Sequence, residues 1–332
     1  MKKRTITTRL VPVLLFSLLL TGCGTKTLNS EKTNEKLTTL NELRPLRPES
    51  VQVDVSETID ANALLKDSKL GYIGQVTVNS EQEVTSKFIN YQLLLDDEEG
   101  NDPSFGAETS VNQNRKGHLN TRDLLIFDPI DKDFGTSGIS SYYSRNGIHY
   151  ANEEELVDIE TNEKGTKHIT EKYYDYRDYL VYAASTERLE YLYDYNLNLF
   201  LTEEGKALIM KATQTGNKLV IESKIDIEKL IRDAVDELLE KSLEIEDVEI
   251  SDYRQEITER ENFDIVTLNK KTADIYTIET KVDFTCNAHF KYNERNLNLV
   301  INADIASNIT FSNLNKVDPA LNYPSDLNDY SL

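Results

Sequence analysis

The sequence has little cysteine, no tryptophan and fewer positive than negative charges. The cysteine count limits the disulfides that can form, and the charge limits the class of partner. Its two cysteines, Cys23 and Cys286, stand far apart in a chain of 332 residues. If Cys23 is modified, no internal disulfide can form, so the fold must depend on a hydrophobic core, for which the chain is long enough. Lys and Arg number 37 against 58 Asp and Glu, which gives a net charge of −21. Because binding to phosphates depends on Lys and Arg, we expect no nucleic-acid partner.

Long hydrophobic runs are missing after the N-terminus, where one short run follows a basic start. Lys2, Lys3, Arg4 and Arg9 precede an apolar stretch over residues 10–20. This stretch is too short to span a bilayer. A basic head, a short apolar core and small residues behind it are typical of an export signal. Removal of residues 1–22 would change the net charge from −21 to −25.

Leu20, Thr21, Gly22 and Cys23 resemble the lipobox of a bacterial lipoprotein signal. The resemblance implies a diacylglycerol on Cys23, cleavage before it, and a protein held by acyl chains at the outer face of the cytoplasmic membrane. The alternative interpretation is an ordinary secretory signal with a chance cysteine. Anionic headgroups would repel an acidic surface, so we expect attachment through the acyl chains and not through a basic patch.

Composition divides the remaining chain into a tether, a single domain and a tail. Residues 23–50 are rich in Thr, Asn, Glu and Lys, which predicts a flexible tether. The domain is expected over residues 51–320 and a tail over residues 321–332. Within the domain, residues 96–137 are acidic and polar and are expected to form a long surface loop. Residues 71–78 and 85–95, before this loop, are expected as two strands.

The C-terminal third shows the clearest strand pattern. Residues 276–292 alternate between apolar and polar side chains, and residues 297–311 repeat the alternation. Residues 257–268 supply a third strand. At about 3.3 Å per residue, the first of these strands spans roughly 50–55 Å, so a sheet of such strands must twist. Cys286 lies on the apolar side, where a free cysteine acts as a small inert hydrophobe.

Two hairpins and two helices are expected before these strands. Asn146 and Gly147 favour the positive φ angles of a tight hairpin turn. A second hairpin is expected over residues 206–224. The tyrosine-rich residues 171–195 have helical spacing, and residues 227–239 carry a single apolar stripe typical of an amphipathic helix.

These patterns together predict an α+β fold, in which a long curved antiparallel β-sheet, an open half-barrel, wraps two or more helices. This arrangement resembles the lipoprotein-carrier superfamily with LolA/LolB-like or LppX/LprG-like folds. More narrowly, it resembles an uncharacterised family of Gram-positive lipoproteins. The resemblance rests on the lipobox, the hairpin at residues 142–150, the hairpin-to-helix unit at residues 207–239 and the Asn269-Lys270-Lys271-Thr272 turn. It implies that acyl chains bind between sheet and helices.

A groove of this kind would be lined by the apolar stripe of the second helix and by the apolar side of the C-terminal strands. The candidate residues are Ile227, Leu230, Ile231, Ala234, Val235, Leu238, Val282, Phe284, Phe290, Leu299 and Ile301.

No motif in the sequence indicates catalysis, a cofactor or a metal. The four histidines are scattered, and no nucleophile elbow or phosphate loop is present. We therefore expect a non-catalytic, membrane-anchored module that binds a lipid or another amphiphile. Two alternatives stay open. The protein could contact an envelope protein without any small-molecule pocket, or residues 15–22 of its signal could be released as a peptide pheromone.

Overall fold

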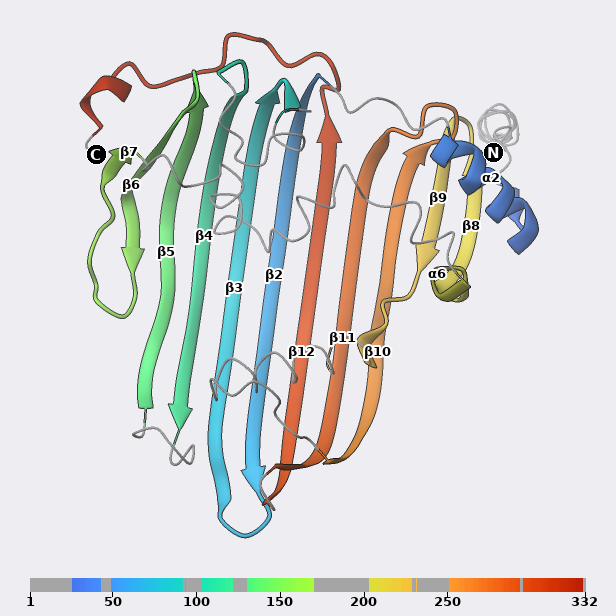
Figure 1. Ribbon diagram of the computed structural model, residues 1–332, viewed down its shortest axis with the longest axis vertical. Helices are drawn as coiled ribbons and strands as arrows, with labels where there is room; N and C mark the ends of the chain where they lie inside the picture. The colour runs from blue at the N-terminus through green and yellow to red at the C-terminus, as the bar shows by residue number, and fades with distance from the viewer. Residues whose placement is uncertain are drawn as a thin grey trace, which may run out of the picture.

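The computed structural model describes residues 26–42, 49–91, 93, 103–121, 130–169, 203–228, 231, 251–292 and 295–330. These residues form one antiparallel sheet of twelve strands, most of them long (Figure 1). The strands are β1 (Lys26–Leu28), β2 (Ser50–Asp67), β3 (Gly71–Ile89), β4 (Gly106–Thr121), β5 (Ile130–Arg145), β6 (Ile148–Asp158), β7 (Lys167–Ile169), β8 (Ile209–Thr215), β9 (Lys218–Ser223), β10 (Ser251–Asn269), β11 (Ile275–Tyr292) and β12 (Arg295–Ser312). The described helices are α2 (Ser30–Glu42), α6 (Glu203–Leu208) and the short 3₁₀ helix η2 (Leu327–Asp329).

The strand order is β1-β8-β9-β10-β11-β12-β2-β3-β4-β5-β6-β7, with β1 and β7 at the two edges. The first long strand, β2, therefore lies beside the last strand, β12, in the middle of the sheet (Figure 1). Their pairing runs without interruption from Leu297 opposite Asp67 to Ser312 opposite Gln52. The centre of the sheet thus forms only when both ends of the chain have come together.

One face of the sheet, here called the buried face, carries most of the core. On β11 every even-numbered residue from Ile278 to Tyr292 is buried, and Cys286 is fully buried. The predicted alternation of residues 276–292 and 297–311 is therefore confirmed. The opposite face, here called the exposed face, carries polar side chains such as His289, which is exposed.

The α+β prediction is wrong, because the described residues are almost entirely sheet. No sheet wrapping two or more helices is found in the described parts of the chain. The two α-helices among them are α2 and α6, which the sequence did not predict. The tyrosine-rich residues 171–195 lie outside the described residues. Of the predicted helix at residues 227–239, only Ile227, Glu228 and Ile231 are described.

The reason for this error is that several strands bury polar side chains. Strand β4 lies inside the segment predicted as an acidic loop, residues 96–137, and it buries Thr109 and Gln113 beside Val111. Its sequence therefore lacks the apolar alternation that reveals a half-buried strand. The two short strands expected over residues 71–95 are likewise one strand, β3, through Ile89.

The predicted tether is also partly structured. Strand β1 pairs with β8, and α2 buries Leu37 and Leu40 completely in the core. Two leucines among otherwise polar residues give too weak a pattern to indicate a packed helix from sequence alone. The first long strand, β2, begins at Ser50.

The two predicted hairpins are present. Asn146 and Gly147 join β5 to β6 with φ angles of 57° and 73°, as a type I′ turn requires. Strands β8 and β9 pair and turn at Gly216, although α6 precedes them where the sequence suggested strand.

The C-terminal residues 313–330, here called the C-terminal strap, cross one end of the sheet from β12 to β7 (Figure 1). Tyr323 Oη donates a hydrogen bond of 2.8 Å to the carbonyl oxygen of Ser144 on β5. Burial raises the pKa of Tyr323 to about 12. Leu327 and Tyr330 are buried against Tyr150. Part of the segment predicted as a tail, including Leu321, Leu327 and Tyr330, is therefore buried.

Candidate functional site

A row of polar side chains crosses the buried face at right angles to the strands. It occupies directly opposed positions on seven neighbouring strands, from β9 to β4. The members, in spatial order, are Ser223, Asp264, Thr280, Ser307, Glu57, Gln82 and Gln113. All but Asp264 are buried. We call this set the polar row.

Part of the polar row is hydrogen-bonded internally. Thr280 Oγ1 donates to Asp264 Oδ1 at 2.6 Å. In contrast, Gln82 Nε2, Gln113 Oε1 and Ser307 Oγ have no hydrogen-bond partner among the described residues, although these three residues are only 4%, 5% and 4% exposed. A buried polar atom without a partner costs about 1–3 kcal/mol, and such atoms are rare in native proteins. The polar row therefore holds hydrogen-bonding capacity that the described residues do not use.

The polar row separates two apolar clusters on the same face. The first cluster includes Val53, Val84 and Leu219 and lies toward the end of the sheet that the strap crosses. The second cluster lies beyond the polar row and follows β11 from Val282 to Tyr292. These eleven residues extend for roughly 33 Å along the strand.

The second apolar cluster brings together part of the predicted groove. Ile227, Ile231, Val282, Phe284, Phe290 and Leu299 are all buried members, and Ile301 packs against them as a partly buried residue. The other four candidate residues lie outside the described residues: Leu230, Ala234, Val235 and Leu238. Sequence reasoning therefore found the apolar half of this face. It missed the polar row, because the row depends on the register across seven strands.

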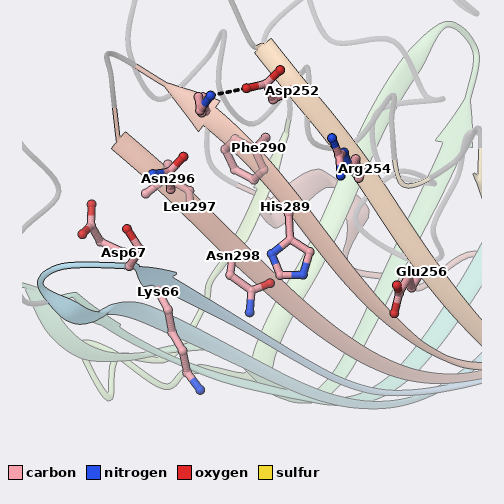
Figure 2. Close-up of a pocket in the computed structure, with 12 residues that line it drawn as sticks. Lys66, Asp67, Asp252, Arg254, Glu256, His289, Phe290, Asn296, Leu297 and Asn298 are labelled. Carbon is pink, nitrogen blue, oxygen red and sulfur yellow. Dashed lines mark hydrogen bonds and ion pairs between the residues drawn. The ribbon is translucent and has the colours of Figure 1, made fainter.

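The exposed face carries a different feature, a depression of about 680 Å³ near the end of the sheet opposite the strap. A second transverse row lies in it, with Lys66, Asn298, His289 and Arg254 on four adjacent strands (Figure 2). These groups can donate hydrogen bonds to a carboxylate or phosphate. Sequence reasoning missed this row for the same reason.

Carboxylates limit the positive charge of this depression. Asp252 is bonded to Lys291, which holds the pKa of Asp252 below its usual range (Figure 2). Glu256 lies further along β10 and also lines the depression. The depression is therefore mixed in charge, with donors in its middle and carboxylates beside them.

The remaining predicted site residues are at the N-terminus. Leu20, Thr21, Gly22 and Cys23 lie outside the described residues. Among the residues that the structure describes, no group of three His, Cys, Asp or Glu side chains is placed to hold a metal ion. Over the same residues, no helix has the length and apolar character needed to cross a membrane.

Comparisons with known proteins give no family. No family model and no curated protein matches the chain. Among solved structures, the chain is similar to the translocator domain of autotransporter NalP from Neisseria meningitidis, at 5% sequence identity and a TM-score of 0.13. The match covers 84% of this chain and 95% of that chain. A similarity this low carries no argument about fold or function.

Proposed function

We propose that this protein is an exported lipoprotein, anchored through Cys23 at the outer face of the cytoplasmic membrane, that binds an amphiphile without catalysing a reaction. The location is supported by the basic start, the short apolar run and the Leu-Thr-Gly-Cys sequence. The binding function is supported by the buried face. An envelope protein is a further possible partner, and no cofactor is required.

The observation that carries the proposal is the position of the polar row beside the second apolar cluster. An amphiphile has a polar part that needs hydrogen bonds and an apolar part that gains by leaving water. Gln82, Gln113 and Ser307 offer donors and acceptors that are already desolvated. The buried apolar side chains from Val282 to Tyr292 begin two residues further along β11 than Thr280 of the polar row. The acyl-chain binding implied by the resemblance to lipoprotein carriers is thus proposed on the sheet alone.

The test uses residues 23–332 in wild-type form and in a Gln82→Met, Gln113→Met double variant. Methionine removes the polar groups and keeps nearly the same volume. We expect mass spectrometry of organic extracts to find an amphiphile in the wild type and much less in the variant. After delipidation, the variant should be more stable than the wild type to unfolding, by about 1–3 kcal/mol, because buried polar atoms without partners are gone.

Asn112→Met serves as the control, since Asn112 precedes Gln113 on β4 but is exposed. It should retain the amphiphile at the wild-type level. Wild-type extracts that repeatedly contain no amphiphile would remove the binding proposal. Equal retention by the double variant would show that the polar row is not the site.

A further inference from the structure

Four lysines gather at one corner of the sheet, where β1, β8, β9 and β10 end. Lys26 on β1 pairs with Gln214 on β8, next to the β8–β9 turn. Lys218 begins β9 after this turn. Lys270 and Lys271 lie in the β10–β11 turn, and the backbone N–H of Lys270 donates to the carbonyl oxygen of Asn217 at 2.9 Å. Because neighbouring strands are about 4.8 Å apart, the backbone positions lie within roughly 15 Å. We call these four residues the lysine corner.

The side chains of the lysine corner are accessible to solvent. Lys26, Lys218 and Lys271 are exposed, and Lys270 is half-buried. Lys218 Nζ lies 5.9 Å from the centre of the Tyr276 ring. In the same turn, Asp274 accepts a hydrogen bond from Thr272 Oγ1.

The neighbouring helix adds a net charge of −1. Near the start of helix α2, Lys32 and Lys36 balance Glu31 and Glu35, and Glu42 is the last residue of the helix. In a chain with a net charge of −21, four lysines at one corner of the sheet, with Asp274 in one of its turns, differ from the average charge of the chain.

The lysine corner is also where the proposed anchor joins the sheet. Only two residues separate Cys23 from Lys26, the first residue of β1. Three residue steps span at most about 11 Å. Acyl chains on Cys23 would therefore bring the lysine corner to the headgroup layer.

We propose that the lysine corner binds anionic phospholipid headgroups and fixes the orientation of the sheet on the membrane. This inference rests on the proposed anchor at Cys23. Attachment through acyl chains gains affinity from electrostatic attraction between a basic patch beside them and anionic lipids. Each lysine near an anionic surface strengthens attachment by about fivefold. The charge of the whole chain predicts repulsion, but the lysine corner places its positive charge where the membrane lies.

In this orientation, the end of the sheet with the β8–β9 and β10–β11 turns lies at the membrane surface. On β10, Asn269 lies at the lysine corner and Arg254 in the exposed-face depression, roughly 50 Å away along the strand. The depression would therefore face away from the membrane, open to the extracytoplasmic space.

The test tethers unlipidated protein to vesicles and maps which lysines are covered. Residues 23–332 are coupled through the Cys23 thiol to a maleimide lipid. Cys286 does not interfere, because it is fully buried and burial raises its pKa. Lysine acetylation, followed by peptide mass spectrometry, is compared on vesicles of phosphatidylcholine alone and of phosphatidylcholine with phosphatidylglycerol. We expect Lys26, Lys218, Lys270 and Lys271 to be labelled severalfold more slowly on the anionic vesicles. Molar salt should abolish this difference, since the screening length falls to about 3 Å.

Two triple variants complete the test, with Lys26 as the reporter. Lys218→Gln, Lys270→Gln, Lys271→Gln should remove the protection of Lys26. Lys66→Gln, Lys69→Gln, Lys116→Gln removes three exposed lysines elsewhere and should leave that protection intact. Equal labelling on both vesicle types, or protection of Lys66 and Lys69 instead, would overturn the proposal. Because the tether is chemical, these results do not depend on acylation of Cys23 in the cell, which mass spectrometry of protein extracted from membranes tests separately.

Discussion

At the scale of single residues, Gly138 shows how closely the strands beside the polar row approach each other. It follows Gln113 in the same transverse line, on β5, with φ at 130°. A Cβ atom there would lie 2.0 Å from the carbonyl oxygen of Glu155 on β6. Side chains rarely adopt this φ, and the neighbouring atom is backbone, which cannot move aside cheaply. Only glycine fits this position without displacing β6.

We therefore predict that Gly138→Ala destabilises the protein by at least about 2 kcal/mol. Urea unfolding followed by circular dichroism measures this loss. Ser140→Ala is the matched control, because Ser140 lies two residues along the same strand, on the same face, and is 1% exposed. Its hydroxyl has no hydrogen-bond partner within the described parts of the chain, so its removal should be neutral or stabilising. A Gly138→Ala variant as stable as wild type would contradict the described geometry.

At the scale of elements, the C-terminal strap is held to β7 by a charged contact. Lys167 Nζ lies 2.8 Å from Asp326 Oδ2 and 3.2 Å from Glu154 Oε2. Hydrogen bonding from Lys167 holds the pKa of Asp326 below its usual value. Because this pKa is lowered, the contact between Asp326 and Lys167 stabilises the folded state above the unfolded-state pKa of Asp, which is near 4. This stabilisation is lost as the pH falls through the folded-state pKa of Asp326. Lowering the pH should therefore weaken the contact between the strap and β7.

We predict that residues 321–330 exchange amide hydrogens faster, after correction for intrinsic rates, below about pH 4. Asp326→Asn should show the faster exchange already at pH 7, because it removes the charge that Lys167 contacts. Asp329→Asn changes an exposed carboxylate three residues away and should leave exchange at the wild-type rate. Exchange that does not depend on pH or on Asp326 would show that Leu327 and Tyr330 hold the strap by packing alone.

The strands also show how far sequence patterns reach. β11 and β12 were predictable, because Val282, Phe284 and Phe290 alternate with polar residues. β4 was not predictable, because Thr109 and Gln113 occupy buried positions that a local pattern reserves for apolar residues. The apolar part of the candidate site followed from these alternations. The polar row did not, because each member becomes part of a row only through its register with the next strand.

At the scale of the whole molecule, the excess of negative charge opposes the compact state. Residues 23–332 carry a net charge of −25. Exposed ion pairs such as Arg260–Asp283 and Lys281–Asp304 act in the opposite sense. Each exposed pair contributes about 1 kcal/mol or less and is itself weakened by salt. Repulsion among many unmatched carboxylates should outweigh these few pairs.

We therefore predict that the melting temperature of residues 23–332 rises by several degrees as sodium chloride increases from about 0.01 M to about 0.5 M, while the screening length falls from about 30 Å to less than 8 Å. Differential scanning calorimetry in a buffer of constant pH measures the shift. Sucrose at matched osmolality is the control, because it acts by exclusion from the protein surface and not by screening. A melting temperature that falls with salt would show that the ion pairs across β10, β11 and β12 stabilise the sheet more than its net charge destabilises it. In that case, replacing Asp283 and Asp304 with Asn should reverse the sign of the salt dependence.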